Sequence, residues 1–316
     1  MSNRWLHLPP GGIHGAACAL LAVSFALNCV TTALANSRAC QGQEQRYEQI
    51  KAGASSIEMN AALFSAAQKG CDALVRRLLN DGASVEARDR LGAMPLSRAA
   101  GAGEATLAAL FLDAGARVDA QNLEGSSALF IAAEFERLAV VRLLLEHGAS
   151  VNLPGRNGIP PLAAAAYTGN IEIVETLLEK GADATAVDAT GKSALAYAAG
   201  RGFTRVVRLL LDRGVDINAR LGNDLTALMW AAGHSEEAGS ADVAETIATL
   251  LDAGARVDDK DNRGRTALMI AAELGHAMAV EVLVRRGADR SLTDKAGKTA
   301  RDLATSDSLR RVLAAK

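Results

Sequence analysis

Apolar residues along this chain recur at the three- and four-residue steps of short amphipathic helices. In the stretch 122–154, a first helix is expected to begin after Gly125, with Ser127 placed to cap its free N–H groups. A second helix carries an apolar stripe on one face and charged residues on the other: Leu138, Val141, Leu144 and Leu145 against Arg142 and Glu146. Gly148 is expected to end it, because glycine adopts the left-handed backbone without a Cβ clash.

The same pattern repeats on both sides of this stretch. The helix-ending glycines are 33 residues apart, except that Gly214 and Gly254 are 40 apart; they are Gly82, Gly115, Gly148, Gly181, Gly214, Gly254 and Gly287. Ala-Ala pairs keep step with them and are expected to let neighbouring helices approach closely, as at Ala132-Ala133. The spacing predicts a solenoid of two-helix units.

The start of the first helix resembles the Thr-Pro-Leu-His-x-Ala-Ala signature of the ankyrin-repeat family. It reads Met94-Pro95-Leu96-Ser97, Pro160-Pro161-Leu162-Ala163, Thr226-Ala227-Leu228-Met229 and Thr266-Ala267-Leu268-Met269. Alanine often replaces the proline, and no unit keeps the histidine. The resemblance covers about Ala61 to Lys316 and implies an all-α ankyrin-repeat solenoid, in which helix-turn-helix repeats are joined by β-turn finger loops.

Residues 1–35 do not follow the repeat and are interpreted as a secretory signal peptide. Arg4 precedes a short apolar run that ends at Ala33-Leu34-Ala35, so cleavage is expected after Ala35. An uncleaved membrane anchor and lipidation at Cys29 are the alternatives. The leader and the alanine-rich repeats are similar to those of exported bacterial ankyrin-repeat proteins, which implies a periplasmic or secreted chain with no membrane insertion after cleavage.

The rest of the chain is divided into three parts. Residues 36–60 are expected to form an N-terminal helical cap, 61–293 the seven repeats, and 294–316 a partial C-terminal capping repeat. Both ends of a solenoid need a polar face because no neighbour covers them. The formal charge of -2 becomes −3 without Arg4, the one charged residue of the leader. This balance gives no electrostatic footprint for nucleic acid.

Two cysteines remain after the leader, which contains Cys18 and Cys29. In an oxidising compartment Cys40 and Cys71 are expected to form a disulfide. That bond would tie the cap to the first repeat and add ~3–4 kcal/mol to stability by the loop-entropy argument. Two unrelated thiols are the alternative.

The sixth unit holds the extra residues of the 40-residue spacing, at 233–242 between its two helices. A solvated bulge is the favoured interpretation. The alternative is a recognition loop or metal site using His234, Glu236, Glu237 and Asp242. No catalytic, phosphate-binding or zinc motif occurs in the sequence, so we expect no enzyme, no cofactor and no metal site. His147 and His276 are expected to serve helix ends and turns.

The remaining candidate for function is the surface. In the ankyrin-repeat family, partners usually contact finger residues and the residues after Ala-Ala on the concave side. Transferred position by position, the partner-binding candidates are Arg90, Leu123, Glu124, Glu134, Phe135, Arg156, Asn157, Tyr167, Lys192, Arg201, Arg263 and Arg265. Phe135 and Tyr167 could form one anchoring patch, or each could lie flat against its own repeat.

The resulting hypothesis is a monomeric, non-enzymatic scaffold that binds a protein partner. A metal-dependent or hydrolytic enzyme using the insertion near His234, and a structural stabiliser of an envelope complex, are the alternatives.

Overall fold

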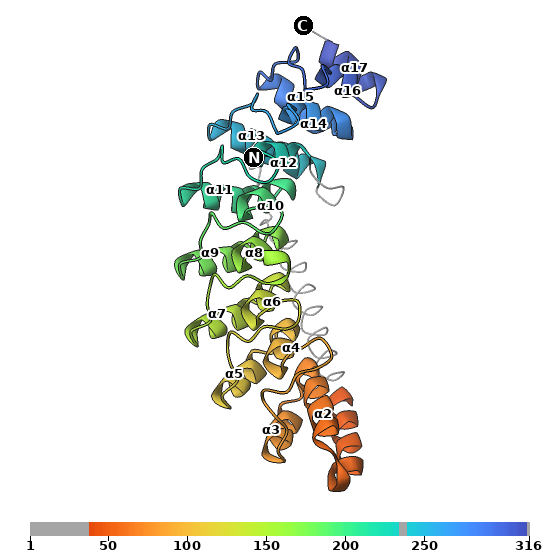
Figure 1. Cartoon of the computed structure of the whole chain (residues 1–316), viewed down its shortest axis with the longest axis vertical. Helices are drawn as coiled ribbons and strands as arrows, with labels where there is room; N and C mark the ends of the chain where they lie inside the picture. The colour runs from red at the N-terminus through yellow and green to blue at the C-terminus, as the bar shows by residue number, and fades with distance from the viewer. Residues whose placement is uncertain (1–37, 234–238, 315–316) are drawn as a thin grey trace, which may run out of the picture. The chain divides into compact units, whose positions relative to one another are not determined.

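The computed structural model describes residues 38–233 and 239–314 (Figure 1). The chain divides into two compact units, the first ending at Ala83 and the second beginning at Ser84. The proposed leader, with Cys18 and Cys29, lies outside the described residues, as do His234, Glu236 and Glu237 of the insertion.

The N-terminal unit contains helical residues 38–50, the short turn η1 (Lys51–Gly53), α2 (Ser56–Lys69) and α3 (Asp72–Asn80). Helix α2 crosses position 60, where the cap was expected to give way to the first repeat. It begins with a capping box, in which Ser55 and Glu58 each bond to the other's backbone N–H. Tyr47 is almost fully buried, and its hydroxyl donates to Asp81 Oδ2 at 2.9 Å.

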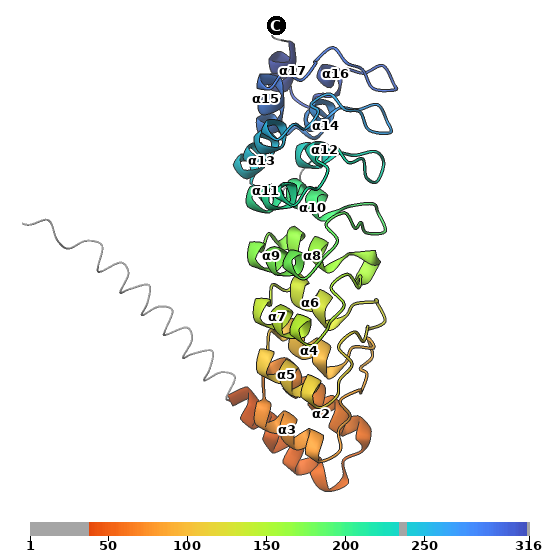
Figure 2. The ribbon, with the colours of Figure 1, turned by 90° about the vertical axis from the view of Figure 1, so that its left-hand side faces the viewer.

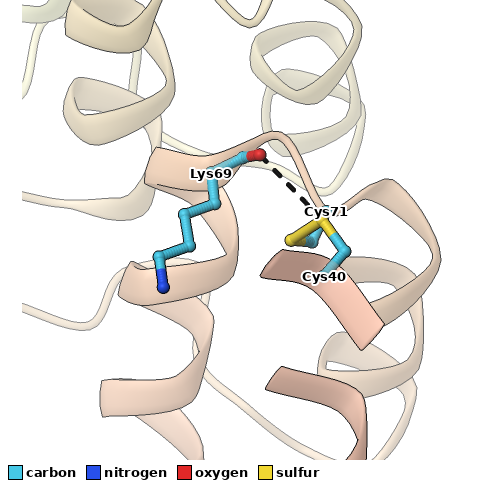
Figure 3. Close-up of a disulfide and its surroundings, with 3 residues drawn as sticks. All are labelled: Cys40, Lys69 and Cys71. Atoms are coloured by element: carbon cyan, nitrogen blue, oxygen red, sulfur yellow. Dashed lines mark hydrogen bonds between the residues drawn. A yellow bond between two sulfur atoms is a disulfide. The ribbon is translucent and has the colours of Figure 1, made fainter. Parts of the chain in front are cut away.

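Cys40 and Cys71 meet within this unit, where their sulfur atoms are bonded (Figure 3). Cys71 lies in the turn between α2 and α3, and the bond joins this turn to the helical residues 38–50. Cys40 Sγ also lies 4.0 Å from the carbonyl oxygen of Lys69. A disulfide sulfur has no hydrogen to donate, so in this bonded form the approach is a van der Waals contact.

The C-terminal unit is a stack of antiparallel helix pairs, which confirms the predicted all-α repeat architecture. Figure 2 shows its first helices and second helices as two columns, with long loops projecting beside the first helices. The pairs are α4 (Pro95–Ala102) with α5 (Ala105–Asp113), α6 (Ala128–Glu134) with α7 (Leu138–Glu146), α8 (Pro161–Thr168) with α9 (Ile171–Glu179), α10 (Ala194–Gly200) with α11 (Thr204–Asp212), α12 (Ala227–Ala232) with α13 (Ser240–Asp252), α14 (Ala267–Leu274) with α15 (Ala277–Arg285), and the terminal α16 (Ala300–Leu303) with α17 (Asp307–Ala314).

The sequence signals for helix ends act as expected. Ser127 and Thr266 accept hydrogen bonds from the N–H groups of Phe130 and Met269 at the starts of α6 and α14. Gly148 follows α7 with a φ of 81°, in the left-handed region. The Ala132-Ala133 pair is completely buried, as close packing of first helices requires.

The buried face of α7 differs in part from the predicted apolar stripe. Val140, Val141 and Leu144 are completely buried, whereas Leu138 and Leu145 are half-buried. The stripe therefore includes Val140, which the prediction left out, because the helix packs on α5, α6 and α9 rather than on one neighbour. Arg142 and Glu146 are exposed, as predicted.

Five-residue loops, here called fingers, precede the first helices. Each finger is closed by a hydrogen bond of 2.9–3.0 Å from the N–H of its first residue to the carbonyl of its fifth. The fingers are residues 89–93, 122–126, 155–159, 188–192, 221–225, 261–265 and 294–298.

Neighbouring finger tips are also bonded to each other. At four junctions the N–H of the second residue donates to the carbonyl of the third residue of the preceding finger, at 3.0 Å. These bonds run from Leu123 to Leu91, Ala189 to Asn157, Asn262 to Asn223 and Lys295 to Arg263.

The insertion in the sixth unit is partly helical. Helix α13 begins at Ser240, so Ser240–Asp242 are helical, which corrects the prediction of a bulge over 233–242. Its 13 residues exceed the nine of α11, so the extra sequence lengthens the second helix. Over the described ranges, no helix has both the length and the apolar character needed to cross a membrane.

Candidate functional site

A pocket of about 400 Å³ opens between the first helices of the third and fourth units. We call it the Tyr167 pocket. Helices α6, α8 and α10 and the finger 155–159 provide its walls, which are Phe130, Glu134, Phe135, Arg156, Ile159, Ala163, Ala164, Tyr167, Thr168 and Tyr197.

The pocket exists because one unit has small residues where its neighbours have large ones. Position 164 is alanine, while the positions 33 residues before and after it are Ile131 and Tyr197. Ala163 corresponds to Phe130 in the preceding unit, whereas the following unit also has an alanine there, Ala196. Helix α8 therefore has only methyl groups at two adjacent repeat positions, and the side chains of α6 and α10 do not fill the space.

Phe130 forms the base of the pocket and is completely buried. Its ring lies against Gly155, where an added Cβ atom would overlap the ring carbons. Glycine at 155 therefore provides the space for Phe130. Phe130 therefore packs inside the stack and is not exposed at its surface.

Exposed aromatic side chains form the rim. Phe135 is 52% exposed and Tyr167 is 45% exposed, which is unusual for rings of this size. Tyr167 meets Tyr197 edge to face, with ring centroids 5.7 Å apart.

Two cations lie over these rings. The guanidinium of Arg201 is 4.7 Å from the centroid of Tyr167. Lys192 Nζ is 4.9 Å from the centroid of Trp230 and 5.5 Å from that of Tyr197. All three distances are within the range of cation–π attraction. The half-buried Trp230 thus presents a ring face to Lys192.

Hydrogen bonds hold the polar part of the rim in place. Arg156 pairs with Glu134 across the mouth of the pocket. The hydroxyl of Tyr197 donates to the buried carboxylate of Asp188. Burial, followed by this hydrogen bond, raises the pKa of Tyr197 well above its ordinary value. Burial alone would raise the pKa of Asp188 as well, but the hydrogen bonds from Tyr197, Lys192 and Thr190 outweigh it and lower that pKa.

The structure therefore brings together half of the candidate partner-binding residues. Glu134, Phe135, Arg156 and Tyr167 line the Tyr167 pocket, and Lys192 and Arg201 lie over its aromatic rim. The others lie at finger positions elsewhere in the C-terminal unit: Arg90, Leu123, Glu124, Asn157 and Arg263 are exposed, whereas Arg265 is partly buried between Asp261 and Glu273.

Sequence reasoning missed Tyr197, Ile159 and the pair Ala163-Ala164. The signal for the alanines was present, because aligning the repeats places Ala164 between Ile131 and Tyr197 and places Ala163 after Phe130. Tyr197 was overlooked because it is followed by an Ala-Ala pair and therefore fitted the helix pattern. His147 and His276 bond through Nδ1 to the carbonyl oxygens of Leu143 and Ala232, at 2.8 and 2.9 Å, which fits the structural roles predicted for them.

Comparison with known families gives matches over most of the solenoid. A family model described as ankyrin repeats (3 copies) matches residues 63–155, 96–188 and 162–249. A second, described as ankyrin repeats (many copies), matches residues 250–304. The crystal structure of the human ASB11 ankyrin repeat domain is similar, with a TM-score of 0.63 and 28% identity, over 70% of this chain and 96% of that one.

Curated relatives match over short stretches. Mouse ankyrin repeat domain-containing protein 63 is 47% identical over 53 residues, which is 17% of this chain and 14% of the relative. Human NAD-capped RNA hydrolase NUDT12 is 36% identical over 67 residues, 21% of this chain and 14% of the relative. The chain thus spans about one seventh of the length of each relative.

Proposed function

Since this chain belongs to the ankyrin-repeat family, whose repeats are generally protein-interaction modules on a typically non-enzymatic fold, we propose that it binds a protein partner at the Tyr167 pocket and its rim. The observation that carries the proposal is the pair of exposed rings, Phe135 and Tyr167, at the mouth of an open pocket. Large aromatic side chains beside a pocket are the usual anchors of protein interfaces.

The surface is ordered before binding. Tyr167 is held by Tyr197 and Arg201, and Tyr197 is held by Asp188. Side chains that are already fixed lose little conformational entropy when a partner binds, so more of the contact energy becomes affinity.

Binding is tested by affinity capture from the extracytoplasmic fraction, comparing the wild type with a Phe135→Ala/Tyr167→Ala double variant. We expect the double variant to lose the partner. Leu274→Ala is the matched control, because Leu274 occupies the repeat position of Phe135 in the seventh unit and is 53% exposed. Equal capture by the double variant and the wild type would disprove the assignment of this surface.

The extracytoplasmic location is part of the same proposal. It is supported by the leader pattern of residues 1–35 and by the bonded pair Cys40 and Cys71, since structural disulfides persist in oxidising compartments. Intact mass of the native protein should give a chain that begins at Asn36. Without reductant, iodoacetamide should label neither cysteine. A chain that retains residues before Asn36, or cysteines that react freely, would contradict this location.

A further inference from the structure

The Tyr167 pocket has the dimensions of a site for one or two apolar side chains. Its volume of about 400 Å³ falls at the small end of the range for ligand sites, roughly 300–1,000 Å³. Its floor is apolar, from Phe130, Ala163 and Ala164, and its walls combine the rings of Phe135, Tyr167 and Tyr197 with the ion pair of Arg156 and Glu134. Such a lining favours a large apolar group over a polar one, because polar groups lose hydrogen bonds to water there.

A positive charge stands beside this apolar floor. Lys192 Nζ lies over Tyr197, which itself lines the pocket. Among the described residues, no carboxylate forms an ion pair with Lys192. Other basic candidates differ, since Arg156 pairs with Glu134 and Arg265, at the same finger position as Lys192 in the seventh unit, pairs with Asp261 and Glu273. An unpaired ammonium on a surface of low polarity favours a partner with negative charge.

Apolar exposure also follows the direction of the stack. Leu91 is 57% exposed and Leu123 is 78% exposed at the finger tips of the second and third units, while Phe135 and Tyr167 are exposed at the ends of the first helices of the third and fourth units. Exposed apolar residues spread over three successive repeats suit an extended chain better than a compact ligand.

We propose that the partner inserts an extended segment here, with an aromatic or leucine-sized side chain in the Tyr167 pocket and an Asp or Glu near Lys192. Packed helices are roughly 8–10 Å apart, and an extended residue spans about 3.3 Å. The acidic residue is therefore about three positions from the apolar one. This inference rests on the proposed function and specifies the chemistry of the partner.

The proposal is tested with a phage library of random 12-residue peptides, selected against the full-length mature protein. Enriched sequences should share an aromatic or large aliphatic residue about three positions from Asp or Glu. Enrichment without that pairing, or no enrichment at all, overturns the proposal.

Variants then locate the bound peptides. Ala164→Tyr fills the pocket with the side chain that Tyr197 has at the same repeat position, and should weaken binding at least roughly 10-fold. Ala164→Ile, which copies Ile131 of the preceding unit, provides a second filled pocket if the tyrosine variant unfolds, as judged by circular dichroism. Lys192→Glu should also weaken peptide binding roughly 10-fold and remove the dependence of the affinity on salt concentration. Leu274→Ala should change neither the affinity nor its salt dependence.

The outcomes separate this inference from the function on which it rests. Peptides that Phe135→Ala/Tyr167→Ala loses but Ala164→Tyr retains would disprove the inserted side chain and leave the surface assignment intact. Peptides that bind all of these variants equally would disprove both.

Discussion

Five fingers of the C-terminal unit are organised by a side chain, and two are not. In the five, Oδ1 of the first residue accepts hydrogen bonds of 2.8–3.0 Å from the N–H groups of the third and fifth residues; these first residues are Asp89, Asn122, Asp188, Asp261 and Asp294. The other two fingers begin with Gly155 and Leu221, which have no such oxygen.

The two exceptions replace the side chain in different ways. At Gly155 the space is taken by the Phe130 ring, and Asn157 adopts a φ of 55°. In the finger that begins at Leu221, a second backbone bond is added, from the N–H of Leu225 to the carbonyl of Leu221 at 2.9 Å, and Asn223 and Asp224 have φ values of 60° and 61°. The comparison shows that the finger beside the Tyr167 pocket lacks the side-chain hydrogen bonds of the regular fingers. The buried ring of Phe130, which lines the pocket, occupies that space instead.

The largest effect on stability is expected from giving the finger at Gly155 the aspartate that begins the regular fingers, because the ring of Phe130 occupies that space. Gly155→Asp should reduce the free energy of unfolding by about 3 kcal/mol, because its Cβ would overlap the ring of Phe130. Urea denaturation followed by circular dichroism measures the change.

A double variant sharpens this test. Phe130→Ser introduces the residue found as Ser97 in the second unit and removes the ring. The double variant with Gly155→Asp should lose less unfolding free energy than the sum of the losses in the two single variants, by at least about 1 kcal/mol. Additive effects would show that Phe130 is not the reason for glycine at 155.

The next effect is the loss of a side chain from a regular finger. Asp188→Ala removes the acceptor for the N–H groups of Thr190 and Lys192 and for the hydroxyl of Tyr197. We expect a loss of about 2 kcal/mol, since three part-buried hydrogen bonds to one carboxylate are lost together. Leu221→Ala, at the same position of an irregular finger, should leave hydrogen–deuterium exchange in its own loop unchanged, whereas Asp188→Ala should increase exchange at Thr190 and Lys192.

A smaller effect of opposite sign is expected at the fourth finger position. Glycine with a positive φ occupies this position in the other fingers, but Asp224 takes it in the sixth unit. Asp224→Gly should therefore stabilise the protein by about 1 kcal/mol. Gly297→Asp is the matched control, because an added Cβ there meets nothing within 4 Å and tests backbone strain alone. It should destabilise the protein by a similar amount, and stabilisation by this change would contradict the strain argument.

The smallest effect is the acid dependence of a regular finger. Because the folded-state pKa of Asp188 is lowered, its ionised form stabilises the fold above the ordinary value of 3.8, and this contribution is lost as pH falls through the lower folded value. Asp188→Asn keeps an acceptor oxygen, as Asn122 does, without the charge. The stability advantage of the wild type should shrink between about pH 6 and about pH 3, as measured by thermal unfolding. An advantage that grows towards acid would have the wrong sign.

The regular part of the fold was predictable because each unit repeats the same local signals. Caps at Ser127 and Thr266, the turn at Gly148 and the buried Ala132-Ala133 pair are all short-range features of the sequence. The pocket was not predicted because it is a property of three units together. Ala164 is an ordinary residue in its own helix and matters only because Ile131 and Tyr197 are larger at the same position. The start of α13 was misplaced because Ser240 and Asp242 also suit a polar loop.

The bonds between finger tips also determine where foreign sequence can be spliced into this protein. Leu123 and Lys295 each reach back to the carbonyl of the preceding tip, so an added finger residue would move the donor away from its acceptor. The chain between two fingers is under no such restriction, because the fingers 221–225 and 261–265 are separated by seven more residues than the others and Asn262 still donates to the carbonyl of Asn223. An epitope tag or a fluorescent reporter grafted between Gly233 and Gly239 would leave the tip-to-tip register, and with it the Tyr167 pocket, in place.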